Sequence, residues 1–170
     1  MKKILLLPII LLMASACNRG PNSTTSIVKS TTINFVSEAH GCSNFFIYAI
    51  STDKTKVLIV QSEKDKLKLN SNPKDFEVGT QNLQVYIDDY KTVENLNKGP
   101  NTWYCDDTAK TDGIVPNKIL AKSGKVRISY PSADKLNIEL KNIKLMSLSG
   151  EELMLTNISF HNVVVGFYPG

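Results

Sequence analysis

The sequence has few of the residues on which most catalytic and nucleic-acid-binding sites depend. Its 170 residues include two His, three Cys and one Trp, and the formal net charge is only +4. Such a small excess does not favour a nucleic-acid partner, which normally needs a concentrated basic face. The sequence has no Gly-x-Ser-x-Gly elbow and no glycine-rich phosphate loop, and a catalytic triad would have to use one of the two His residues. We therefore expect a protein that is not an enzyme and that has no nucleic-acid partner.

A hydrophobic run long enough to span a bilayer is also missing. The apolar stretch 4–13, interrupted by Pro8, has about ten residues, roughly half of what a transmembrane helix needs. It follows Lys2 and Lys3 and precedes the small residues 14–16, which is the layout of a secretory signal peptide. The sequence therefore predicts a leader over residues 1–16.

The leader ends in Ala14-Ser15-Ala16, and Cys17 follows. This stretch resembles the lipobox of bacterial lipoproteins, in which an aliphatic residue and two small residues precede a Cys, with Ala14 in place of the commoner Leu. The resemblance implies cleavage just before Cys17 and its lipidation with a diacylglyceryl group and acyl chains such as palmitate. Two or three chains hold a protein stably at a membrane, whereas one chain holds it only marginally. The alternative is an ordinary signal peptide with an accidental Cys.

The residues after Cys17 bear on where such a lipoprotein resides. In that family an Asp after the Cys favours the inner membrane, and some bacteria mark surface export with acidic residues; here Asn18 follows, without acidic neighbours. The resemblance implies the cell envelope, lipid-anchored in the outer membrane and facing the periplasm. Residues 17–30 are rich in Ser, Thr and Asn and predict a flexible tether. The whole chain resembles the small envelope lipoproteins of Bacteroidota-type bacteria.

Residues 31–170 predict one β-rich domain. Without its leader the chain has 154 residues and a net charge of +2, because Lys2 and Lys3 are lost. This length suits one domain with a substantial core. Apolar residues at alternate positions, bounded by polar turns, indicate short strands. The expected strands include 31–37, 44–51, 56–61, 66–70, 76–78, 83–87 and 125–130.

The expected fold is an all-β, antiparallel β-sandwich of Greek-key or meander type with at most one short helix. That helix is expected within 89–98, where Tyr90, Val93 and Leu96 have helical spacing. The last third of the sequence contains two changes of phase, because alternation shifts by one residue near Asn142 and again near Asn162. Since such a shift exchanges the faces of a strand, a β-bulge is expected at each position.

Two cysteines remain once Cys17 is assigned to lipid. In an oxidising compartment, Cys42 and Cys105 predict a disulfide. The bridge would close a loop of about 64 residues, and the chain-entropy model gives it roughly 4 kcal/mol. The alternative is a pair of buried free thiols.

The one constellation that could carry chemistry surrounds this predicted disulfide. An imidazole lies two residues before Cys42, and two carboxylates directly follow Cys105. If the bridge forms, these groups could come within about 10 Å of one another. A carboxylate-rich corner would suit Ca²⁺, and a His–Asp pair could support acid–base catalysis. In the opposing interpretation these Asp residues only form turns and face solvent. The protein then has no cofactor. The residues of this possible metal site are His40, Asp88, Asp89, Asp106 and Asp107.

Trp103 and Tyr104 could form an exposed aromatic platform for a sugar ring or a partner protein. Alternatively, Trp103 covers the disulfide and the edge of the sandwich. His161 lies within a predicted strand and is expected to be a structural histidine.

Together these features predict a non-catalytic binding or structural module whose partner is a protein or a glycan. One alternative is an enzyme that acts on an envelope polymer through His40, Asp106 and Asp107. Another is a hydrolase inhibitor.

Overall fold

The structure is a computed structural model of the chain. It describes residues 32–42, 45–62, 64–80, 82–98, 104–105, 114–132 and 134–165. In chain order the elements are β1 (His40–Cys42), β2 (Phe46–Ile50), β3 (Lys56–Gln61), α1 (Lys64–Leu67), β4 (Lys74–Glu77), β5 (Gln84–Asp89), α2 (Val93–Lys98), β6 (Asn117–Ser132), β7 (Lys135–Met146), β8 (Glu152–Leu155) and β9 (Ile158–Val164). In this part of the chain no helix has the length and apolar character needed to cross a membrane.

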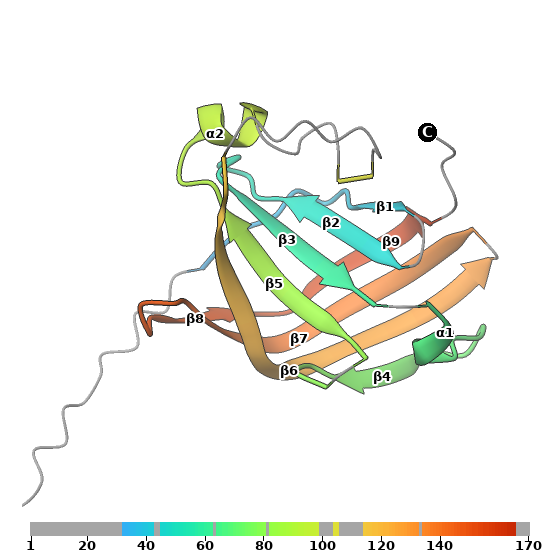
Figure 1. Cartoon of the computed structure of the whole chain (residues 1–170). Coiled ribbons are helices and arrows are strands. Elements are labelled where there is room, and N and C mark those ends of the chain that lie inside the picture. Colours follow the sequence, from blue (N-terminus) through green and yellow to red (C-terminus); the bar gives the residue numbers. More distant parts are fainter. Residues whose placement is uncertain are drawn as a thin grey trace, which may run out of the picture.

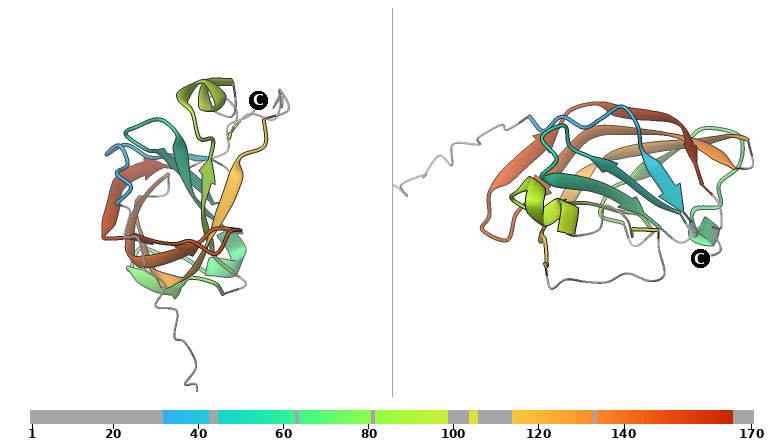
Figure 2. Two further views of the ribbon diagram at one scale, coloured as in Figure 1. Left: turned by 90° about the vertical axis from the view of Figure 1, so that its left-hand side faces the viewer. Right: turned by 90° about the horizontal axis from the view of Figure 1, so that it is seen from above.

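All nine described strands belong to one antiparallel sheet, which confirms the expected all-β class. The hydrogen-bonded order is β1-β2-β3-β5-β6-β7-β8, with β4 also on β6 and β9 also on β7. Figures 1 and 2 show that the sheet curls, so that β2, β3 and β5 face the long strands β6 and β7 across one interior. The two layers of the expected sandwich are therefore halves of one continuous sheet.

The long strands β6 and β7 pair with each other and join these halves, because each also pairs with two further strands along its other edge. One end of β6 pairs with β5 and the other end with β4. Likewise, β7 pairs with β9 over its first half and with β8 over its second half. The separate strand β8 was not expected from the sequence.

The predicted β-bulges are confirmed near both asparagines. In β7, Asn142 and the residue after it face the single Gly124 of β6. In β9, Asn162 and the residue before it face the single Asn137 of β7. Both Asn142 and Asn162 have a positive φ, 51° and 55°, a region in which Asn occurs more often than most residues. Each bulge returns the apolar side chains after it to the interior.

The core is built by strands that carry apolar residues on both faces. In β3, Leu58 and Val60 join the main cluster inside the curled sheet, while Val57 and Ile59 join a second cluster on the outer face. All four side chains are buried, and full burial of such a side chain stabilises the fold by about 1.5–3 kcal/mol. The outer cluster is covered by residues from α2 and its flanking segments, namely Tyr90, Leu96 and Tyr104.

The expected short helix is α2. Thr92 caps it, because its Oγ1 accepts a hydrogen bond from the Asn95 amide at 3.1 Å. Tyr90 and Leu96 are buried in the outer cluster, but Val93 remains 42% exposed. Two of the three helically spaced residues therefore face the body of the protein.

Two of the predicted strands are wrong. The edge strand predicted at 66–70 begins in the helical turn α1, which buries Leu67 and is followed by Lys68 with a positive φ of 46°. The strand predicted at 31–37 is reduced to one bridge between Phe35 and Ser51, because the following residues leave the ladder.

Candidate functional site

The predicted disulfide between Cys42 and Cys105 is confirmed. The two residues are 63 positions apart in sequence, and their Cα atoms lie 5.7 Å apart. The bridge ties the segment that contains Tyr104 to the end of β1. Tyr104 thereby packs against the outer cluster of the sheet.

Tyr104 belongs to a layer of rings rather than to an exposed platform. Its ring centroid lies 5.6 Å from that of Phe46 and 5.2 Å from that of Tyr48. Tyr48 in turn lies 5.2 Å from the ring of His40. Tyr104, one of the two residues suggested for an exposed platform, is only partly exposed, because its ring packs against Phe46 and Tyr48. Trp103, the other residue of that prediction, lies outside the described residues.

Beneath this layer lies the buried carboxylate of Asp88, which is 6% exposed. Its Oδ2 accepts a 2.8 Å hydrogen bond from the Tyr104 hydroxyl, whose oxygen lies 3.1 Å from that of Tyr90. Among the described residues, Oδ1 of Asp88 has no hydrogen-bond partner. Burial raises the pKa of Asp88, although the Tyr104 hydroxyl and the nearby Lys118 oppose the rise. Burial also raises the pKa of Tyr90, to about 12.

The possible metal site is not assembled by the described part of the chain, in which no three His, Cys, Asp or Glu side chains gather. Asp88 hydrogen-bonds to Tyr104, and Asp89 lies 3.6 Å from the ammonium group of Lys56. His40 is separated from Asp88 by the rings of Tyr48 and Tyr104. The remaining predicted residues, Asp106, Asp107 and the lipidation residue Cys17, lie outside the described residues.

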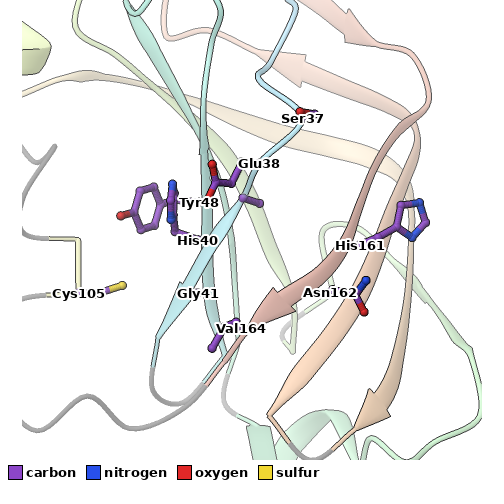
Figure 3. Close-up of a pocket in the computed structure, with 10 residues that line it drawn as sticks. Ser37, Glu38, His40, Gly41, Tyr48, Cys105, His161, Asn162 and Val164 are labelled. Carbon is purple, nitrogen blue, oxygen red and sulfur yellow. The ribbon is translucent and has the colours of Figure 1, made fainter.

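A cavity of about 590 Å³ lies beside this layer, where the curled sheet comes back to its first strand. One side is formed by the chain leading into β1, with Ser37, Glu38 and His40, and the other side by His161 and Asn162 of β9. Figure 3 shows Glu38 and His40 on the β1 side, and the ring of Tyr48 in β2 lies 5.2 Å from that of His40. We call this cavity the seam groove.

Two irregularities of the backbone open the seam groove. Between Phe35 and His40 the chain advances five residues, while the facing chain advances only three, from Tyr48 to Ser51. The surplus residues around Glu38 therefore bulge from the ladder. On the opposite side lies the β9 bulge at Asn162. Bulges often redirect side chains beside functional sites.

The side chains of the seam groove suit a polar ligand rather than a metal ion. A carboxylate, an imidazole, an amide and a hydroxyl can form hydrogen bonds, and the ring of Tyr48 adds an aromatic wall. Figure 3 shows the imidazoles of His40 and His161 on opposite sides and pointing away from one another. The two rings are therefore not arranged to share one ion.

Sequence reasoning missed this groove because its two sides are more than a hundred residues apart in the chain. The change of phase near Asn162 was the one local signal of an irregularity there. His161, expected to be a structural histidine, is instead exposed and lines the groove.

No protein-family model matches the chain, and no curated protein or solved structure matches it either.

Proposed function

We propose that this protein is a bacterial envelope lipoprotein with a non-catalytic binding domain whose partner is a protein or a glycan. Cys17 carries the lipid that holds it at the outer membrane, on the periplasmic side, and residues 17–30 form the tether. The leader, with its Ala14-Ser15-Ala16-Cys17 ending, supports the anchor. The β domain is the part that meets the ligand.

The observation that carries the binding function is the seam groove. Its volume of about 590 Å³ falls within the usual range of ligand sites. The polar side chains of Glu38, His40 and Asn162 can orient a ligand, and Tyr48 offers a ring against which an apolar face can pack. This combination suits the hydroxyl groups and ring faces of a glycan as well as the backbone and side chains of a peptide.

The test uses a soluble form that begins at residue 17 and carries Cys17→Ser. Every described strand lies within 32–165, so this form keeps the whole described sheet. It is applied to an array of envelope polysaccharide fragments and to immobilised envelope proteins, with and without Ca²⁺. We expect binding that the double variant Glu38→Ala/His40→Ala weakens at least tenfold.

The matched control is Glu77→Ala, which removes an exposed carboxylate of β4 that pairs with Lys125 at the surface. It should bind like the parent protein. Equal loss in both variants, or binding that neither variant changes, would contradict the seam groove as the site.

A further inference from the structure

The described strands that surround the core form a ring with an odd number of members. Around the curl run β1, β2, β3, β5, β6, β7 and β9, and every hydrogen-bonded pair among them is antiparallel. Direction therefore alternates six times, so β1 and β9 run parallel where they meet. One more strand between them, antiparallel to both, would give the ring an even number of strands.

The two end strands touch at one end of the seam. A Cβ atom on Gly41 would lie 2.7 Å from the backbone oxygen of Val164 and 2.7 Å from a side-chain carbon of Val165. Toward the start of each strand the chains diverge, and there the seam groove opens between Ser37 and His161. The seam is thus a wedge that is closed at Gly41 and open at Ser37.

Both sides of this wedge present strand edges. In the described part of the chain, no backbone hydrogen bond joins β1 to β9. The amide of Val165 donates to the backbone oxygen of Asp134, on the side of β7. In the described part of the chain β1 pairs only with β2 and β9 pairs only with β7, so each of these strands has one unpaired edge, and the two edges face the seam. An unpaired edge of this kind is a template for another extended chain.

We propose that the seam groove accepts one extended peptide segment of a partner protein, inserted antiparallel to β1 and β9. This inference deepens the proposed binding function and rests on it. A segment that spans the open part of the wedge, from Ser37 to His40, has about four residues, roughly 13 Å in extended form. Its backbone groups satisfy those of the two edges, and alternate side chains point inward and outward.

The walls of the groove set the side chains that fit. On the inner side, Ala39 lines the groove and packs against the main cluster, so inward positions take small apolar residues. On the outer side, the exposed carboxylate of Glu38 lines the groove. An outward Lys or Arg complements this charge.

The experiment pans the soluble Cys17→Ser form against a phage-displayed library of dodecapeptides. Selected peptides are synthesised with and without N-methyl groups at alternate backbone amides. We expect the methylated peptides to bind at least tenfold more weakly, because N-methylation removes the donors that pair with an edge while the side chains remain. We also expect the unmodified peptide to slow amide hydrogen exchange in β1 and β9.

Two tryptophan variants locate the site. Ser37→Trp places a large ring in the open end of the wedge, and Ser149→Trp places the same ring on the exposed turn between β7 and β8. The first variant should lose binding at least tenfold, and the second should not. Peptides that bind equally well when N-methylated, or equally well to Ser37→Trp, overturn the inference.

The outcomes also separate this inference from the proposed function. If a glycan binds in a manner that Ser37→Trp abolishes and no peptide does, strand insertion fails while the binding function stands. If the only seam-dependent ligand is a second copy of the chain, detected as a dimer by light scattering, insertion of a partner's peptide fails. If neither peptide nor glycan depends on Ser37, both fail.

Discussion

Gly124 of β6 lies so close to Asn142 of β7 that a Cβ atom at position 124 would be 2.9 Å from the Asn142 backbone oxygen. The same Cβ atom would lie 2.7 Å from the side chain and 2.8 Å from the Cα atom of Ile143. Gly124 also has a φ of +131°, which residues with a side chain rarely adopt. At this point the bulge at Asn142 turns the side chains of Ile143 and Leu145 into the interior.

Gly124→Ala is therefore expected to lower the free energy of unfolding by at least about 2 kcal/mol, through overpacking and backbone strain. Gly150→Ala is the matched control. Gly150 also has a positive φ, +83°, but an added Cβ atom there would meet nothing within 4 Å. The free energy of unfolding of Gly150→Ala should be lower than that of the wild type by only about 1 kcal/mol. Urea unfolding of both variants measures the difference, and equal losses would contradict close packing at Gly124.

The bulges could be predicted because a local sequence pattern indicates them. The disulfide could be predicted because the sequence has few cysteines. A shift in alternation at Asn142 or Asn162 is visible in a handful of residues and has one common structural cause. If Cys17 carries lipid, as proposed, two cysteines remain and allow one pairing. The prediction at 66–70 failed because the segment begins inside the helical turn α1 and continues through Lys68, whose φ is positive, while Leu67 and Leu69 both pack against the main cluster as they would in a strand.

Tyr104→Phe tests the hydrogen bond to the buried carboxylate of Asp88. The variant removes the hydroxyl that donates to Oδ2, and a buried charged acceptor then loses a partner. The expected loss in the free energy of unfolding is about 2–3 kcal/mol. The control is Tyr86→Phe, which removes a hydroxyl that donates to the neutral Gln61 side chain at 3.1 Å. Its expected loss is about 1 kcal/mol, and a loss as large as that of Tyr104→Phe would contradict the special role of Asp88.

Asp88→Asn tests the raised pKa of this carboxyl group. The folded protein holds the Asp88 proton more tightly than the unfolded chain, whose carboxyl has an ordinary pKa of 3.8. The favourable contribution of Asp88 to the free energy of unfolding is therefore complete below the pKa of the unfolded chain. It is lost as the pH rises through the pKa of Asp88 in the folded protein. Unfolding measured from about pH 3 to pH 7 should show the variant gaining stability relative to the wild type as the pH rises.

The control for this pH dependence is Asp53→Asn. A hydrogen bond from the Ser51 hydroxyl is the main cause that lowers the pKa of Asp53, an exposed turn residue. The contribution of Asp53 to the free energy of unfolding is present above the ordinary pKa of a carboxyl group. It is lost as the pH falls through the lowered pKa of Asp53 in the folded protein. The stability difference between this variant and the wild type should therefore change with pH in the opposite direction. The same direction in both variants would contradict the assigned shifts.

The burial of Asp88 could not be predicted from the sequence, in which Asp88-Asp89 indicates a solvated or metal-binding pair. Asp88 is covered because the disulfide places Tyr104, sixteen residues later, over the outer face of β5. The seam groove is equally remote from local patterns, because it forms only when β9 reaches the chain before β1. Both features depend on contacts between segments that are far apart in the sequence, and no local pattern in either segment predicts such a contact.

The proposed anchor predicts a defined change at the N-terminus. In cells that express the full chain, mass spectrometry should find a mature protein that begins at Cys17 and carries acyl chains, and detergent should be needed to extract it. Cys17→Ser should abolish both acylation and membrane retention, because the thiol that receives the lipid is gone. An intact leader, or an unmodified Cys17 in the wild type, would contradict the anchor without bearing on the seam groove.

The disulfide should stabilise the fold and also position the cover over Asp88, and these roles can be separated. Cys42→Ala/Cys105→Ala removes a bridge between residues 63 positions apart, and the expected loss is about 4 kcal/mol from the larger entropy of the unfolded chain. Without the bridge, Tyr104 is held over β5 less firmly, so Tyr104→Phe should cost less in this background than in the wild type. A double-mutant cycle measured by urea unfolding gives this coupling, for which 0.5 kcal/mol is about the smallest significant value. Strictly additive losses would mean that the ring contacts with Phe46 and Tyr48 hold Tyr104 in place without the disulfide.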